Sequence, residues 1–162
     1  MATIVTKLFN IVEPTTAYFG QKDAAQCVLI QRIVEDLDMD VTIQIQETIR
    51  EPDGLAKSSR NVYLSPEERA AAPVVYRSLC AARDLFDKLS ADSSIDSEVL
   101  METVENILQE EPLVQKIQYV SVDSRATMRS LERVEKTEGA IVSLACRVGN
   151  VRLIDNVVLK PH

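Results

Sequence analysis

The sequence predicts an α/β piece followed by a small α+β domain with an antiparallel sheet. Residues 16–46 carry a strand, a helix and a second strand in succession, and such a unit belongs to a parallel sheet. After Ser65 the alternation stops, and two helices precede a series of strands. The last two strands meet at Gly149-Asn150, a dipeptide typical of two-residue hairpin turns. We therefore expect two domains, at residues 1–64 and 65–162.

The composition is that of an acidic globular protein. Of the 162 residues, 46% are apolar and 27% are charged, which suffices for a packed core. The net charge of −7 argues against a general nucleic-acid-binding protein, because such proteins usually carry a basic face. No apolar run approaches the ~18 residues of a membrane span, and the N-terminus lacks the pattern of a secretory signal. We expect neither nucleic acid nor membrane among the partners.

The cysteines and the single histidine exclude several kinds of site. Cys27, Cys80 and Cys146 lie far apart and form neither a zinc pattern nor a redox CxxC. We interpret them as buried free thiols in a reducing compartment, which predicts a cytoplasmic location. His162 is the sole histidine, so this chain holds no histidine-centred triad and no multi-histidine metal site. We expect no metal site built from its side chains.

The first part of the chain divides into short elements. Leu8, Ile11 and Val12 have helical spacing within residues 6–12, and Pro14 ends that helix. An apolar strand, a broadly apolar helix and an alternating β-branched strand are then expected at residues 16–20, 22–39 and 41–46. These are few elements for a doubly wound domain. We therefore expect the tail of a larger α/β domain here.

The second part opens with a well-marked helix start. Ser65 stands in the N-cap position, Pro66 follows it, and Glu68 lies three residues further on. This helix is expected to run to residue 90, with Pro73 as a candidate kink. The remaining expected elements are a polar linker at 91–96, a helix at 97–111, a strand at 115–124, a helical turn or short helix at 126–135, and strands at 139–148 and 151–159.

A first candidate site lies in the stretch YFGQKDAAQ, residues 18–26. A strand ends at Gly20 and a helix begins soon after, which is where open α/β sheets bind ligands and where backbone N–H groups face an anion. Lys22 adds a full charge, and Gln26 lies four residues on, so both can face one pocket. The alternative is structural, with Asp23 and Gln26 as a capping box and Lys22 as a solvated side chain.

A second candidate site is the loop that contains Lys57, Ser58, Ser59 and Arg60. Arg60 can hold a polyphosphate with two parallel hydrogen bonds, Lys57 can act as a point charge, and the serines add donors. Such a loop can close over the transferring group and stabilise its negative charge. The alternative is an exposed polar linker between domains.

The two stretches support one another. They follow consecutive strands of a parallel pair, and the carboxyl ends of parallel strands share one edge of the sheet. We therefore expect Lys22, Lys57 and Arg60 to converge on one ligand. A convergent cationic site with hydroxyl donors indicates nucleotide binding.

The same stretches carry a family resemblance. TKLFNIVEPTTAYFGQKDAAQ followed by REPDGLAKSSRNVYLSPEER resembles the pantothenate synthetase (pantoate–β-alanine ligase) family, and the resemblance covers essentially the whole chain. It implies a Rossmann-like nucleotidyltransferase domain followed by a small α+β domain. It also implies a two-step ligase of the pathway to coenzyme A. Pantoate attacks the α-phosphate of ATP, with Mg²⁺ present, to give pantoyl adenylate, and β-alanine then displaces AMP to give pantothenate.

Carried across residue by residue, the resemblance implies two groups of ATP contacts and one pantoate contact. Gln26 would hydrogen-bond pantoate, and Lys57 stands where the family often has Met or Leu. The implied ATP-binding residues are Gly20, Gln21, Lys22, Asp23, Ile49, Lys57, Ser58, Ser59 and Arg60.

The resemblance also marks what this sequence does not contain. The family carries an HIGH-like motif with two histidines in its N-terminal portion, and no counterpart stands here. We therefore expect a C-terminal part of the enzyme, without catalytic residues of its own and inactive in isolation. We also expect a homo-oligomer. The alternative is a non-catalytic module that binds a nucleotide or another protein.

Overall fold

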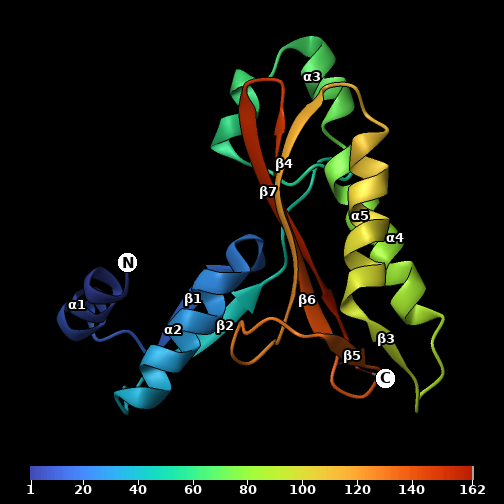
Figure 1. Ribbon diagram of the computed structural model, residues 1–162. Coiled ribbons are helices and arrows are strands. Elements are labelled where there is room, and N and C mark those ends of the chain that lie inside the picture. Colours follow the sequence, from blue (N-terminus) through green and yellow to red (C-terminus); the bar gives the residue numbers. More distant parts are fainter. Residues whose placement is uncertain (162) are drawn as a thin grey trace. The chain divides into compact units, whose positions relative to one another are not determined.

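The structure is a computed structural model that describes residues 1–161 (Figure 1). The sequence-based exclusion of histidine-centred sites depends on His162 being the sole histidine. His162 lies outside the described residues. Contacts within the chain divide it into two compact units, unit 1 at residues 1–48 and unit 2 from Ile49 onward.

Unit 1 contains the predicted strand–helix–strand run. Strand β1 (Thr16–Gly20) pairs in parallel with β2 (Thr42–Gln46), and Gly20 lies opposite Gln46. The connection runs through a short 3-10 helix, η1 (Gln21–Asp23), and helix α2 (Ala24–Asp36). Helix α1 (Ala2–Val12) precedes them, and its C-cap Glu13 has left-handed backbone. The predicted parallel pair is confirmed.

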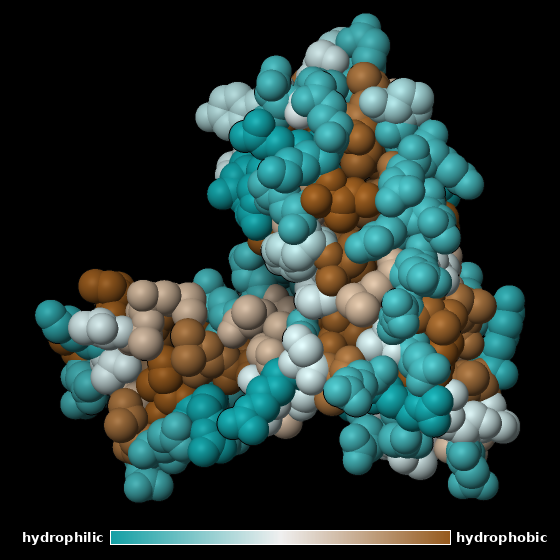
Figure 2. Space-filling view, in the orientation of Figure 1, coloured by the Kyte–Doolittle hydropathy of each residue, from teal (hydrophilic) through white to brown (hydrophobic). Residues whose placement is uncertain are grey.

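The core of unit 1 is small. Phe9 of α1 meets Phe19 of β1 edge to face, with 6.4 Å between ring centroids. The buried apolar residues of this unit are Phe9, Ala24, Cys27 and Ile30. The stripe from which α1 was predicted is exposed instead, with Ile11 at 78% and Val12 at 65% of full exposure. Figure 2 shows apolar surface over α1 and α2.

Unit 2 is an α+β structure with two antiparallel sheets. A three-stranded sheet has the order β4-β6-β7, and a two-stranded sheet pairs β3 with β5. Its elements are η2 (Ser59–Tyr63), α3 (Pro66–Ala71), α4 (Val74–Asp87), β3 (Ser94–Asp96), α5 (Ser97–Gln109), β4 (Val114–Asp123), β5 (Arg133–Glu135), β6 (Ala140–Val148) and β7 (Val151–Leu159).

Helices α4 and α5 lie side by side and pack against the three-stranded sheet (Figure 1). Each helix turns one apolar stripe inward. Leu79 and Phe86 of α4 and Leu100 and Val104 of α5 have no exposed surface. Strand β6 lies between two partners and is buried along nearly its whole length, which explains its continuous apolar sequence. Among the described residues, no helix is both long and apolar enough to cross a membrane.

Three expectations for unit 2 were wrong in detail. The helix expected from Pro66 to residue 90 is two helices, because Pro73 has no N–H to continue the first. The expected linker at 91–96 contains β3, and the range 126–135, expected as a helical turn or short helix, ends in β5. A single turn, in which the Met128 N–H donates to the Ser124 carbonyl, precedes β5. The two short strands form because they pair with each other and bury Val134.

The segment at residues 49–64 belongs to unit 2, although the predicted domain boundary lies at residues 64 and 65. Leu55 and Ala56 are almost fully buried, and Leu55 is part of the main core. Arg50 forms an ion pair with Asp155 of β7. Packing thus assigns residues 49–64 to unit 2. The predicted boundary was based on the change of sequence pattern at Ser65.

Candidate functional site

The first group of candidate residues lies where β1 ends. Gly20 is the last residue of the strand, the next three residues form η1, and Gln26 lies in the first turns of α2. Lys22 and Gln26 are both half-buried, and Asp23 is exposed. Asp23 is the N-cap of α2 but accepts no capping hydrogen bond through its side chain, so the capping-box interpretation is wrong.

Cys27 fixes the base of this turn. Its thiol donates to the carbonyl oxygen of Gly20 at 3.3 Å, and burial, aided by Asp23, raises the pKa of the thiol. A neutral buried thiol that bonds its own turn is a structural group. Cys27, Cys80 and Cys146 are all free, as predicted. Cys27 and Cys146 are also buried as predicted, whereas Cys80 is only partly buried.

The second group stands on a short hairpin formed by residues 49–57. Lys57 N–H donates to the Ile49 carbonyl at 2.9 Å, and Glu51 N–H donates to the Leu55 carbonyl at 2.8 Å. The Asp53 carboxylate accepts from the Leu55 N–H at 3.2 Å, as an Asx turn does. Gly54 closes the turn with φ of 91°, a left-handed value that glycine tolerates. The Pro-Asp-Gly sequence therefore sets the direction in which residue 57 leaves the hairpin.

The loop beyond the hairpin is held by its own side chains. The Ser58 hydroxyl caps η2 by accepting from the Arg60 N–H at 3.3 Å. The Asn61 amide nitrogen donates to the Ala56 carbonyl at 3.0 Å and so closes the loop from Ala56 to Asn61. The segment at 57–60 thus has a defined path in unit 2.

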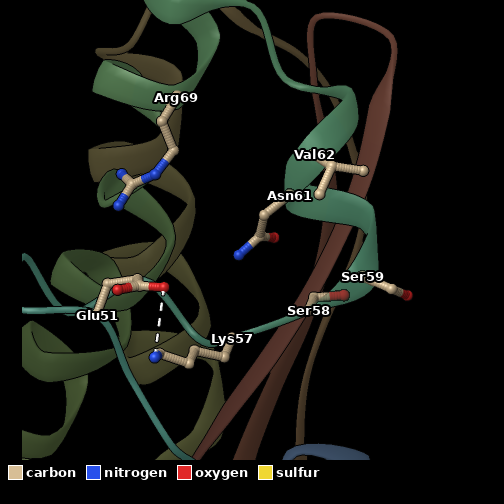
Figure 3. Close-up of a pocket in the computed structure, with 7 residues that line it drawn as sticks. All are labelled: Glu51, Lys57, Ser58, Ser59, Asn61, Val62 and Arg69. Carbon is tan, nitrogen blue, oxygen red and sulfur yellow. Dashed lines mark ion pairs between the residues drawn. The ribbon is translucent and has the colours of Figure 1, made fainter.

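A cavity of about 550 Å³ opens beside this loop (Figure 3). Its lining residues carry two cations, one carboxylate and three polar groups. They are Glu51, Lys57, Ser58, Ser59, Asn61, Val62 and Arg69.

The charged groups of the cavity are arranged in pairs. Lys57 Nζ lies 3.8 Å from a Glu51 carboxylate oxygen, and Arg69 donates to Asp53 at 2.6 Å. This hydrogen bond lowers the pKa of Asp53 and raises the pKa of Arg69. Both pairs are partly exposed, so the cations remain accessible to an anion that enters the cavity. Lys57, Asn61 and Arg69 point toward the open space in Figure 3.

The structure brings together part of the second predicted group. Lys57, Ser58 and Ser59 line the cavity, whereas Arg60 is exposed and is not among its lining residues. Ile49 is also outside the lining and is 71% exposed.

The sequence analysis missed the four further lining residues, Glu51, Asn61, Val62 and Arg69. Asn61 and Val62 directly follow the predicted loop, so an extension by two residues would have included them. No sequence signal near Arg69 indicates a binding residue. Arg69 lies on α3, and its ion pair with Asp53 forms only in the folded chain.

The two groups of residues that were predicted to converge lie in different units. Gly20, Lys22 and Gln26 lie in unit 1, and Lys57 and Arg60 lie in unit 2. That convergence therefore stays a prediction.

Comparison with known proteins identifies relatives along nearly the whole chain. The family model described as pantoate-beta-alanine ligase matches residues 1–158. Pantothenate synthetases from Chloroflexus aggregans and Herpetosiphon aurantiacus are 52% and 50% identical over 159 residues. That alignment covers 98% of this chain and 55% of each relative.

Solved structures agree with this match. The pantothenate synthetase of Thermus thermophilus superposes with a TM-score of 0.86 at 38% identity, over 99% of this chain and 55% of that one. The pantoate-beta-alanine ligase of Francisella tularensis, complexed with beta-gamma ATP and beta-alanine, gives a TM-score of 0.62 at 28% identity, over 99% of this chain and 51% of that one. The chain thus spans about half the length of these relatives. It belongs to the pantoate-beta-alanine ligase family.

Proposed function

We propose that this chain is part of an ATP-dependent ligase that condenses pantoate with β-alanine through a pantoyl-adenylate intermediate. The observation that carries the proposal is the cavity beside Lys57, Ser58 and Ser59 in a chain of this family. The relative from F. tularensis was solved with an ATP compound and β-alanine, which supports both as ligands here. Pantoate follows from the family's description as a pantoate-beta-alanine ligase.

The triphosphate is assigned to the 57–60 loop. Lys57 supplies a point charge, Ser58 and Ser59 supply hydroxyl and backbone donors, and the exposed guanidinium of Arg60 can bind two phosphate oxygens at once. Ile49, the first residue of the hairpin, is assigned to the nucleotide.

Gly20, Gln21, Lys22 and Asp23 form the second set of ATP contacts in this proposal. The start of helix α2, where backbone N–H groups and the helix dipole favour an anion, supports this assignment. Gln26 is assigned to pantoate. We also propose that unit 1 is part of a Rossmann-like nucleotidyltransferase domain, and the parallel β1–β2 pair supports this.

Magnesium is assigned to the phosphates of ATP. Within residues 1–161, no group of three or more acidic, cysteine or histidine side chains is arranged to hold a metal ion. Mg²⁺ usually keeps several waters and binds through substrate phosphates with one or two carboxylates.

The proposed chemistry depends on positioning and on charge. A carboxylate oxygen of pantoate attacks the α-phosphorus, and pyrophosphate leaves with the electron pair of the broken P–O bond. The neutral β-alanine amine then attacks the acyl carbon, AMP leaves with the electron pair of the broken C–O bond, and the nitrogen loses a proton to solvent. The pantoate carboxylate is already ionised, so the first step needs no general base. Cations at residues 22, 57 and 60 would stabilise the charge that develops on the phosphates.

An ATP titration tests the assignment of the loop. In isothermal titration calorimetry with ATP and Mg²⁺, we expect weak binding to the 162-residue chain. Arg60→Ala should bind at least about tenfold more weakly, since one charge-assisted hydrogen bond contributes about 1.5–3 kcal/mol. Lys22→Ala should weaken binding in the same direction. Arg129→Ala is the matched control, because Arg129 is exposed in the turn before β5.

Three outcomes would count against the proposal. Equal affinity of Arg60→Ala and Arg129→Ala would show that the loop does not hold the phosphates. Release of pantothenate by this chain alone, at more than trace levels, would contradict our expectation that it is inactive in isolation. Absence of any ATP binding would leave the candidate site without a ligand.

A second candidate function is a module that binds another protein or a second copy of itself. The exposed apolar residues of α1, among them Ile4, Leu8 and Ile11, favour association. We propose a homo-oligomer on this ground and a cytoplasmic location from the free cysteines. A monodisperse monomer in light scattering at high protein concentration would contradict the oligomer.

A further inference from the structure

Arg50 joins three parts of unit 2 through one side chain. Its guanidinium donates to both carboxylate oxygens of Asp155 on β7, at 2.6 and 3.0 Å. The same group donates to the Gly54 carbonyl at 3.1 Å, at the tip of the 49–57 hairpin. It also lies 3.6 Å from the ring centroid of Tyr76 on α4. A strand, a helix and the hairpin thus meet at one cation.

The contact is built to be rigid. The side chain of Arg50 is 17% exposed and that of Asp155 is 1% exposed, so solvent screens the pair little. Two parallel hydrogen bonds between a guanidinium and a carboxylate fix orientation as well as distance. The Tyr76 ring adds a cation–π contact on the face of the guanidinium.

Arg50 lies at the base of the hairpin that leads to the candidate loop. Its backbone forms an antiparallel bridge with Ala56, the residue before Lys57. The backbone hydrogen bonds from Lys57 to Ile49 and from Glu51 to Leu55 flank this bridge. Any shift of Arg50 relative to β7 therefore moves the start of the 57–60 segment.

We propose that Arg50, held by Asp155 and Tyr76, is a positioning residue that sets the place of the 57–60 loop relative to the sheet of unit 2. Arg50 contacts no ligand in this assignment and acts through the hairpin. The inference rests on the proposed function for its ligand and on the described contacts for its mechanism. Asp155 serves as the anchor of Arg50 in this proposal.

Hydrogen exchange measures this role without any ligand. Arg50→Lys keeps the charge but loses the fork that bonds both oxygens of Asp155. We expect the amides of Glu51 and Lys57 to exchange about tenfold faster, because local opening then breaks fewer charge-assisted hydrogen bonds. Asp155→Asn should give the same pattern with an almost unchanged side-chain shape. The double variant should add little to either single change, since both remove one interaction.

Nucleotide binding supplies the second readout. In the ATP titration, Arg50→Lys should raise the Kd for ATP with Mg²⁺ by about twofold, because the loop then spends about half of its time outside the binding position. Lys57 and Arg60 are unchanged in that variant, so the loss acts through their placement.

A variant of Lys136 controls for general destabilisation of unit 2. Lys136 is 2% exposed, donates to the Phe86 carbonyl at 2.9 Å and lies 4.3 Å from the Phe86 ring. Lys136→Met therefore removes a buried cation that sits over an aromatic ring elsewhere in the same unit. We expect this control to lower the urea midpoint of unfolding while leaving the loop amides and the ATP affinity unchanged.

The outcomes separate the two proposals. If exchange at Glu51 and Lys57 is the same in Arg50→Lys and wild type, the positioning role is wrong. If Lys136→Met changes loop exchange and ATP affinity as much as Arg50→Lys does, the effect is general destabilisation and the role is also wrong. If wild type binds no ATP while Arg50→Lys still loosens the loop, the proposed function fails and the anchoring of the loop stands.

Discussion

Cys146 shows how burial controls a single ionisable group. It lies in the central strand β6 with no exposed surface, and desolvation raises the pKa of its thiol to about 11. In the unfolded chain a thiol ionises at about pH 8.5. Because the folded pKa lies above the unfolded one, the stability that depends on the neutral thiol is complete below about pH 8.5 and falls as the pH rises toward about 11.

This shift predicts an alkaline loss of stability. Between about pH 8 and about pH 10, the Cys146 thiol should lower the free energy of unfolding by about 2 kcal/mol. Urea unfolding of wild type and Cys146→Ala at both pH values measures the difference, since lysines and tyrosines titrate alike in both proteins. An identical pH dependence in the two proteins would contradict the assignment.

At the scale of the element, α3 depends on its first turn. The Ser65 hydroxyl accepts from the Glu68 N–H at 3.2 Å, and the Glu68 carboxylate accepts from the Ser65 N–H at 2.8 Å. This is the capping box that the sequence predicted. A helix of six residues has few other sources of stability, and α3 carries Arg69 to the cavity.

Removal of the cap should therefore be measurable. Ser65→Ala should lower the free energy of unfolding of unit 2 by about 1 kcal/mol. Glu102→Ala on the exposed face of α5 serves as the control and should change stability by less than about 0.5 kcal/mol. Equal midpoints for Ser65→Ala and wild type in urea unfolding would show that the box contributes nothing.

At the scale of the whole molecule, the two units differ in their cores. Unit 1 buries four apolar residues, whereas the core of unit 2 joins two helices to a three-stranded sheet. Stability follows the apolar area removed from water, so unit 1 should open first. In native-state hydrogen exchange, the amides of β1 and α2 should exchange faster than those of β6. The reverse order would mean that contacts outside unit 1 stabilise it more than its own core does.

Sequence alone determined the elements that local signals specify. The Gly149-Asn150 turn, the Ser65 capping box and the period-two pattern of β2 each depend on neighbouring residues, and the structure confirms all three. The family resemblance rests on the same kind of local information, since it came from contiguous stretches of residues. The candidate loop at 57–60 was also found from contiguous residues, and Lys57, Ser58 and Ser59 of that loop line the cavity.

Tertiary structure decided what depends on partners distant in the chain. Strands β3 and β5 are too short to be recognised alone and exist because each completes the hydrogen bonds of the other. Arg69 and Asp53 meet across 16 positions, and Arg50 and Asp155 across 105. A pattern read within a window of neighbours cannot detect such pairs, because their attraction depends on a distance that folding alone creates.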